Sequence, residues 1–541
     1  MRIKTSAATL LLGALILGAP GLSRAQAFGQ NKVQYHQFLW SYYRTEHFDI
    51  YFPQGAELIA SFAARNVETM YRGVTAMVGH KLGARVPIIL HNSHAEFEQT
   101  NVIRLPLHEG IGGFTEIFKN RIVLPFEGSY TDFYHVLKHE MTHAVCFDML
   151  FGDNAASMVS HQATQFPLWV SEGLAEYASL GWDLSSEFFM LDATTFGYVA
   201  PPTVDFGGFL AYKGGQLFLH FVDNTYGKGT VTKLIRTLSE AHDLPQAFKK
   251  VTKTSLEEAG EIWLRELRFI YWPELGQRSY GKTVARRLTD RSKDQSFYNL
   301  QPSISPNGEE IAFFSDRETW EAIYILNVKS EKVTRSVIQG GKGEKHESFH
   351  SFKSGIAWSP DSKQIAIVSK KHGKDVIHIL GATRKNRGRI VREIGPDVQA
   401  ILSPNWSRDG RYIAFSGMKD GLTDIYVWDL TRNELRQLTH DLAHDDHPVF
   451  SPSGRWIAFE SDRRNAVVRP PSANPLDDYD SLLMFKDIYK VRLAGDSLTK
   501  VAGGAFDEKQ PSYGPADSML VFISNRSGID NIYLSLDSGG A

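Results

Sequence analysis

The apolar and polar positions divide the chain into two regions with different periods. From about residue 28 to residue 280, short apolar runs alternate with long stretches of helical period. The runs at 48–52 and 86–90 predict strands, and the stretches at 57–78 and 214–224 predict helices. This mixture predicts an α+β domain over residues 28–280.

A repeat fills residues 281–541. Five copies of a turn related to Ser-Pro-x-Gly are each followed by an apolar strand, and the copies begin at Pro302, Ala357, Pro404, Pro448 and Pro511. Isoleucine followed by tyrosine or histidine then recurs at 323, 377, 425, 488 and 532. Small sheets repeated in this way predict an all-β propeller. Closure with five or with six blades stays open, and an insertion at about 465–485 in the fourth copy is predicted to be a surface loop.

The composition is that of a folded, multidomain protein. The chain has 541 residues, of which 42% are hydrophobic and 22% are charged. With 59 Lys and Arg against 61 Asp and Glu, the net charge of -2 gives no electrostatic case for nucleic acid as a partner. A peptide or protein partner is expected instead. The single cysteine, Cys146, excludes a disulfide framework.

The N-terminus has the pattern of a secretory signal. Arg2 and Lys4 precede an apolar run at 7–18, and Ala-Gln-Ala follows at 25–27. A signal peptide is therefore predicted over residues 1–27. The apolar run is shorter than the roughly 20 residues that span a bilayer, and no later run is longer, so no membrane span is expected. The sequence predicts an exported protein, periplasmic or extracellular and of bacterial type.

The strongest chemical signal is His139-Glu140-Met141-Thr142-His143, which lies in a helical pattern at 133–150. Two histidines four residues apart share one helix face and can bind one Zn²⁺ ion, and Glu140 is placed to polarise a water molecule there. A catalytic zinc also needs a third protein ligand, which a carboxylate on a second helix can supply. His135 lies about 12 Å along the helix from His143, so one ion cannot bind both. His135 is expected behind the site or at the surface.

Two later segments resemble motifs of the gluzincin aminopeptidases. Trp169-Val-Ser-Glu172-Gly173-Leu-Ala175 is similar to their W-L-N-E-G-F-A motif, which implies that Glu172 is the third zinc ligand, with Glu176 as the alternative. Tyr212-Lys-Gly-Gly215, placed just before the helix predicted to begin at 216, resembles their Y-E-K-G segment. This resemblance implies that Tyr212 stabilises the oxyanion, and the alternative is a tyrosine packed in the core.

A predicted hairpin precedes the metal helix. Residues 112–118 and 121–126 read as two strands joined by Lys119 and Asn120, and an edge strand at this place can bind an extended peptide through its backbone. Glu116 is a candidate for recognition of a substrate amine.

The motifs together resemble exported, gluzincin-like peptidases of the peptidase MA superfamily that carry TolB-like propellers. The resemblance implies a zincin-like metallopeptidase domain at 28–280 followed by the propeller. It also implies a zinc metallopeptidase with Glu140 and Tyr212 catalytic and one Zn²⁺ bound by His139, His143 and Glu172. The propeller would gate or recruit the peptide or protein substrate, or bind an envelope protein.

Two other interpretations are considered. One is a non-catalytic periplasmic scaffold that acts through the propeller, although a scaffold has no use for Glu140 between two metal ligands. The other is a prolyl-oligopeptidase type of enzyme, which needs a G-x-S-x-G nucleophile motif that the sequence does not contain.

Overall fold

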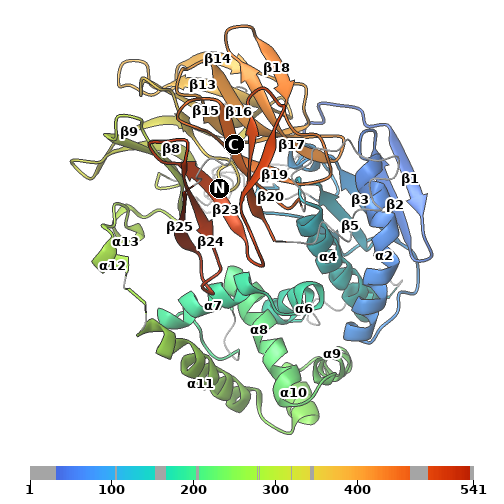
Figure 1. The fold of residues 1–541 in the computed structure, drawn as a ribbon. Coiled ribbons are helices and arrows are strands. Elements are labelled where there is room, and N and C mark those ends of the chain that lie inside the picture. The colour runs from blue at the N-terminus through green and yellow to red at the C-terminus, as the bar shows by residue number, and fades with distance from the viewer. Residues whose placement is uncertain are drawn as a thin grey trace, which may run out of the picture.

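The computed structural model describes residues 32–103, 107–152, 166–202, 206–276, 278–279, 281–318, 320–340, 346–463 and 485–536 (Figure 1). The predicted signal peptide at 1–27 and nearly all of the insertion at 465–485 lie outside these described residues. Within the described ranges, no helix combines the length and the apolar character that a bilayer crossing requires.

The N-terminal region is built on a mixed five-stranded sheet. Its order is β1 (Trp40–Arg44), β2 (Phe48–Pro53), β3 (Val86–His91), β5 (Arg121–Pro125), β4 (Phe114–Glu116). The three central strands are parallel, and the two outer strands pair antiparallel to their neighbours. The strands predicted at 48–52 and 86–90 and the predicted hairpin are confirmed, and β4 is an edge strand.

Helices cover both faces of this sheet because its strands alternate between two cores. Ile122 and Leu124 of β5 face the large core shared with α2 (Glu57–Val78) and α4 (Tyr130–Phe151), whereas Val123 faces a small core near α3 (His94–Phe97). The helix predicted at 57–78 is confirmed. The helix that contains the histidine motif runs further at both ends than the predicted 133–150, since Ser129 caps it by accepting a hydrogen bond from the Asp132 amide.

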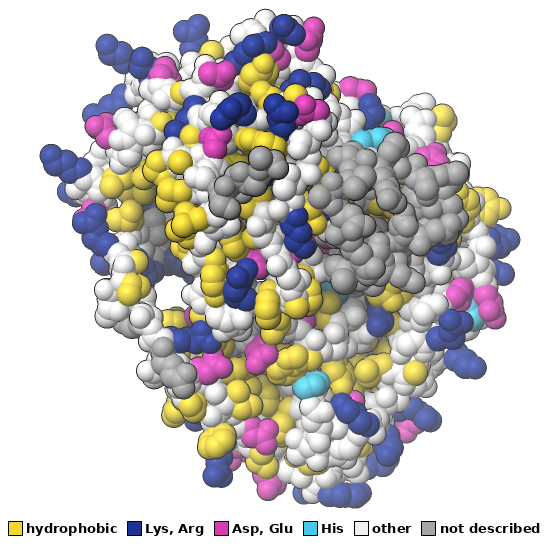
Figure 2. All heavy atoms as spheres, viewed as in Figure 1, with side chains coloured by type: hydrophobic (Ala, Val, Ile, Leu, Met, Phe, Trp, Pro, Cys, Tyr) yellow, Lys and Arg dark blue, Asp and Glu magenta, His cyan; other side chains and the backbone are white. Residues whose placement is uncertain are grey.

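A helical layer follows α4. It contains α6 (Leu168–Leu180), α7 (Leu184–Thr195), α8 (Phe209–Thr225), α9 (Thr230–Ala241), α10 (Leu244–Thr252) and α11 (Leu256–Leu275). The prediction for α8 was wrong at its start, because the helix begins at Phe209 and Tyr212 lies inside it. Figure 2 shows hydrophobic side chains gathered on the face over α7 and α11.

The described part of the C-terminal region contains five small antiparallel sheets (Figure 1). The short helices α12 (Gly281–Val284) and α13 (Arg291–Asp294) precede the sheets. The first sheet comprises β6 (Asn299–Ile304), β7 (Glu310–Ser315), β8 (Ala322–Asn327) and β9 (Lys332–Gln339). The second comprises β10 (Ser348–Phe349), β11 (Ala357–Trp358), β12 (Gln364–Lys371), β13 (Lys374–Gly381) and β14 (Ile390–Ile394). The third and fourth comprise β15 (Ala400–Trp406), β16 (Tyr412–Lys419), β17 (Leu422–Asp429) and β18 (Glu434–Gln437), and β19 (Asp445–Phe450), β20 (Trp456–Ser461), β21 (Asp487–Arg492) and β22 (Leu498–Ala502). The fifth comprises β23 (Glu508–Tyr513), β24 (Met519–Ser524) and β25 (Asn531–Leu536).

The repeated isoleucine shows how these sheets pack. It is 0% exposed in the first four sheets, at Ile323, Ile377, Ile425 and Ile488. The corresponding Ile532 of β25 is 78% exposed. The first four copies therefore bury this side chain between neighbouring sheets, whereas the fifth leaves it open to solvent in the described structure.

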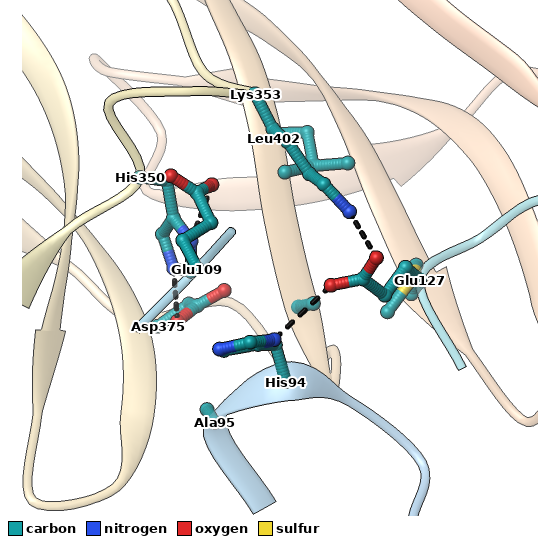
Figure 3. Close-up of a pocket in the computed structure, with 10 residues that line it drawn as sticks. His94, Ala95, Glu109, Glu127, His350, Lys353, Asp375 and Leu402 are labelled. Carbon is teal, nitrogen blue, oxygen red and sulfur yellow. Dashed lines mark hydrogen bonds and ion pairs between the residues drawn. The ribbon is translucent and has the colours of Figure 1, made fainter. Parts of the chain in front are cut away.

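The two regions share one packed boundary. Ala400 and Met418 of the third sheet belong to the large core of the N-terminal region, and the Tyr130 hydroxyl donates to the Gly421 carbonyl at 3.0 Å. Beside them lies a cavity of about 20 Å³, which is room for about one water molecule. Figure 3 shows two ionic groups among the residues that line it. In one group, Glu127 contacts His94 and Lys353; in the other, His350 contacts Glu109 and Asp375. The propeller thus packs directly against the start of α4.

Candidate metal centre

The two motif histidines meet on the buried face of α4. Their spacing of four residues places them one turn apart, and the Nε2 atoms of His139 and His143 lie 3.1 Å from each other. Both side chains are buried. Two imidazole nitrogens at this separation can bind the same ion.

Glu172 completes the arrangement from α6. Its Oε2 atom lies 3.3 Å from the Nε2 atoms of both His139 and His143. With metal–ligand bonds of about 2.0–2.1 Å, two ligands of a tetrahedral zinc are separated by about 3.3 Å. The three atoms therefore have the spacing of three corners of a zinc tetrahedron, and the donor set of two imidazoles and one carboxylate suits Zn²⁺.

Glu176, the alternative third ligand, lies behind the site. Its Oε1 atom is 2.9 Å from Nδ1 of His139 and 3.3 Å from Nε2 of His135, and its Oε2 atom accepts from Lys213 Nζ at 2.6 Å. A carboxylate bound to the outer nitrogen of a histidine fixes the tautomer whose inner nitrogen binds metal. The geometry places Glu172 beside Nε2 of both motif histidines and Glu176 behind His139, with His135 beside Glu176.

Two supporting side chains were missed by the sequence analysis. Lys213 neutralises Glu176, and the Ser171 hydroxyl lies 3.3 Å from Nδ1 of His143. Ser171 lies directly before Glu172 and Lys213 directly after Tyr212, so each is adjacent to a predicted site residue. Neither position has a pattern that separates it from other serines and lysines of the chain.

The ionisation of the cluster favours a bound cation. Burial alone would raise the pKa of Glu172, but hydrogen bonds from His139 and His143 lower it to about 2. Burial would likewise lower the pKa of His139, yet Glu172 and Glu176 raise it to about 10. The carboxylates thus hold negative charge that a proton neutralises in the metal-free protein and that a metal ion can neutralise in its place.

Glu140 lies beside the three ligand atoms and is held by the edge strand. The Thr115 hydroxyl of β4 donates to Glu140 Oε2 at 2.7 Å. Gly113, just before β4, packs closely on both β5 and α4, because a Cβ there would lie 2.4 Å from Leu124 of β5 and 3.2 Å from Val136 of α4. A glycine at this position lets the strand approach the metal helix, and Thr115 then orients the carboxylate.

Tyr212 reaches the same site from α8. Its ring stacks on that of His139 with an interplanar angle of 13° and a centroid separation of 6.1 Å. Burial, followed by the charges of Glu172 and Glu140, raises the pKa of its hydroxyl well above the ordinary value. The hydroxyl therefore stays protonated near neutral pH and can donate a hydrogen bond.

These residues line one cleft of about 580 Å³. Its apolar walls include Ile111, Phe114, Val136, Phe147 and Phe209, and His135, His139, Glu140, His143, Glu172 and Glu176 lie at its base. Glu116, the candidate for amine recognition, instead pairs with Arg121 at 3.0 Å. The residues that line the cleft do not include Glu116.

Comparisons with known proteins address the propeller. A family model described as the TolB beta propeller domain matches residues 357–467. Among solved structures, a TolB candidate from Agrobacterium tumefaciens is 23% identical, with a TM-score of 0.35, over 45% of this chain and 79% of that one. TolB from Acinetobacter baumannii is 17% identical, with a TM-score of 0.35, over 44% of this chain and 52% of that one.

A prolyl endopeptidase is 12% identical, with a TM-score of 0.30, over 44% of this chain and 33% of that one. The aligned regions span about half of the Acinetobacter protein and a third of the prolyl endopeptidase. The family model identifies a TolB-like β-propeller in the C-terminal region, which follows a separate region of mixed helices and strands.

Proposed function

We propose that the protein is a zinc-dependent metallopeptidase. The observation that carries the proposal is the triangle formed by His139 Nε2, His143 Nε2 and Glu172 Oε2, with edges of 3.1, 3.3 and 3.3 Å, beside Glu140. Three protein ligands leave a fourth position for water or substrate, as a catalytic zinc requires.

Each of the side chains at the site has a separate role in the proposed hydrolysis of a peptide bond. Zn²⁺ bound here supplies a Lewis acid and lowers the pKa of water towards neutrality. Glu140 takes the proton of the attacking water and passes it to the leaving amine. Tyr212 donates a hydrogen bond to the oxygen on which negative charge develops. Glu176 holds His139 in the tautomer that binds metal.

The cleft supports binding of an extended peptide. β4 is the outer strand of its sheet and carries Phe114 and Thr115 into the cleft lining. A substrate can pair with this edge through its backbone and place apolar side chains against the cleft walls. Binding through the backbone depends little on the amino-acid sequence of the substrate, and it favours unfolded or flexible chains.

The same cleft favours cleavage of internal bonds. Every charged residue among those that line it belongs to the metal centre, Glu116 is paired with Arg121, and Lys213 is paired with Glu176. A substrate therefore finds no spare carboxylate for a terminal amine and no spare cation for a terminal carboxylate in the described lining. We infer endopeptidase action.

The location and the role of the propeller belong to the same proposal. The predicted signal at 1–27 and the TolB-like propeller favour a protein exported to the periplasm or beyond. Because the propeller packs on the start of α4, it can limit access to the cleft or recruit a protein substrate or envelope partner.

The test combines metal analysis with peptide cleavage. The purified chain should contain one Zn²⁺ that is lost in His139→Ala, and it should cleave members of a peptide library. Glu140→Gln should keep the zinc and lose turnover. Full activity in Glu140→Gln would exclude the mechanism, and absence of any zinc at His139 would favour a non-catalytic scaffold.

A further inference from the structure

A second group of metal-binding side chains lies in the fourth sheet of the propeller. Asp446 and His447 belong to β19, and Glu460 belongs to its neighbour β20. Nδ1 of His447 is 3.4 Å from Asp446 Oδ2 and 3.4 Å from Glu460 Oε2, and all three atoms lie within 4.8 Å of one another. The two distances from His447 are close to those at the centre on α4.

The contacts of His447 are those of ligands around a shared ion. His447 Nδ1 forms ion-pair contacts with both carboxylates, and their length of 3.4 Å exceeds the usual 2.7–3.2 Å of a hydrogen bond. Two bonds of about 2.1 Å to a common metal place their ligand atoms roughly 3.0–3.4 Å apart. The two distances from His447 therefore match the spacing of ligands on one ion.

Hydrogen bonds from three successive sheets hold the two carboxylates. Asp446 Oδ1 accepts from the Ser416 hydroxyl at 2.8 Å, which leaves Oδ2 turned towards His447. Glu460 Oε1 accepts from Lys486 Nζ, and Oε2 accepts from the Gln510 amide, each at 2.8 Å. Outer hydrogen bonds of this kind orient the ligands of metal sites.

A feature of the repeat places the imidazole. The pairing of β19 with β20 shifts register after Asp446, and His447 has a φ of 53°. Gln301, Ser403 and Gln510 have nearly the same positive φ in three other sheets. The bulge therefore belongs to the fold, whereas the histidine at the bulge with two carboxylates beside it distinguishes the fourth sheet.

The three residues differ in exposure, and a second imidazole lies in their electrostatic field. The His447 side chain is 27% exposed, while the carboxylates of Asp446 and Glu460 are buried. His444, two residues before Asp446, is buried with both ring nitrogens lacking a hydrogen-bond partner. It lies in the electrostatic field of Asp446 and Glu460.

We propose that Asp446, His447 and Glu460 bind a divalent transition-metal ion independently of the centre on α4. One imidazole with two carboxylates is a donor set for ions of the Zn²⁺ or Mn²⁺ class. Lys486 neutralises one oxygen of Glu460, so this site binds more weakly than the centre on α4. A bound ion joins β19 to β20 and stabilises the propeller rather than taking part in hydrolysis.

The experiment counts ions in the full chain after chelator treatment and dialysis against Zn²⁺ alone or Mn²⁺ alone. Wild type should retain two ions, His447→Ala and His139→Ala one each, and the double variant none. His440→Ala, which changes an exposed histidine of the same propeller, should retain two. Circular dichroism verifies folding, and Asp446→Asn provides a near-isosteric second variant.

An unchanged ion count in both His447→Ala and Asp446→Asn would overturn this proposal. The ion should also raise the thermal midpoint of His139→Ala but not that of the double variant. If His139→Ala and wild type each hold one ion that His447→Ala loses, the proposed peptidase centre fails while the propeller site stands. The two proposals are therefore tested separately.

Discussion

Gly173 of α6 and Gly215 of α8 touch through their backbones. A Cβ on Gly173 would lie 2.4 Å from the carbonyl carbon of Gly215, and a Cβ on Gly215 would lie 2.2 Å from the carbonyl oxygen of Trp169. Glu172 is adjacent to the first glycine, and Tyr212 precedes the second by three residues. This close helix crossing brings Glu172 and Tyr212, the proposed metal ligand and hydroxyl donor, to the same cleft.

Gly173→Ala should therefore weaken both the fold and the metal centre. The added methyl group meets rigid backbone, so α6 and α8 must separate, at a cost of about 1–3 kcal/mol in the free energy of unfolding. Zinc affinity should fall because Glu172 moves with α6. Chemical denaturation and zinc titration measure the two effects. Gly214→Ala is the control, since its Cβ meets only side chains, and equal losses in both variants would contradict the argument.

Glu176→Ala should reduce zinc affinity without removing a ligand. The change frees Nδ1 of His139 from its carboxylate and leaves the Lys213 ammonium unpaired near the site. Loss of such a supporting group lowers metal affinity by about 10–100-fold. Competition with a chromogenic chelator measures the dissociation constant. Glu172→Ala should lose more zinc affinity than Glu176→Ala. A larger loss in Glu176→Ala would make Glu176 the ligand.

Thr115→Val should slow turnover while zinc stays bound. The substitution removes the hydroxyl that donates to Glu140 and keeps nearly the same volume. A hydrogen bond to a charged group contributes about 1.5–3 kcal/mol, so kcat should fall by roughly 10–100-fold. Thr142→Val on α4 is the control, because that hydroxyl only bonds to the Lys138 carbonyl. Equal kcat values for the two variants would show that Thr115 does not position Glu140.

Part of the site could be predicted from the sequence because residues on one face of a helix recur with a regular spacing. The spacing of His139 and His143 implies a shared helix face, and the period at 57–78 implies α2. The assignment of Glu172 as the third ligand came only from a resemblance, because 29 positions separate it from His143 and no helical period links the two residues. The separate roles of Glu172 and Glu176 depend on how α6 crosses α4, which is a property of packing.

Other features needed the folded chain for different reasons. Tyr212 was predicted to lie before a helix, but α8 begins at Phe209, and the close contact of Gly215 with α6 outweighs the low helix propensity of glycine. Asp446, His447 and Glu460 come together through a bulge and a strand pairing, which leave no spacing rule in the sequence. Boundary contacts such as Tyr130 to Gly421 join residues 291 positions apart.

Acid should loosen the boundary between the two regions through Glu127. Burial would raise the pKa of this carboxyl, but Lys353 and His94 lower it to about 2 from an ordinary 4.5. A depressed pKa means that the folded state binds fewer protons than the unfolded state. The stabilisation is therefore complete above about pH 4.5 and is lost as the pH falls towards 2.

Glu127→Gln should make the free energy of unfolding less dependent on pH below about 4.5. The stability that wild type loses there through Glu127 is at most about 3 kcal/mol. Denaturant unfolding at several pH values between 7 and 2 measures it. Glu274→Gln is the control, because its pairing with Arg278 is half exposed and should contribute under about 1 kcal/mol. The same acid dependence in Glu127→Gln and wild type would assign the effect to other groups.

Peptides blocked at both ends should be cleaved as well as free ones. Glu116 is held by Arg121 and by the Lys119 amide, so a terminal amine would have to displace an existing ion pair. A terminal charge without a buried partner contributes under about 1 kcal/mol, so kcat/KM should change less than about fivefold on acetylation and amidation. Glu116→Gln should leave this ratio unchanged. A hundredfold preference for the free amine, lost in Glu116→Gln, would instead make the enzyme an aminopeptidase, because Glu116 would then have exchanged Arg121 for the substrate.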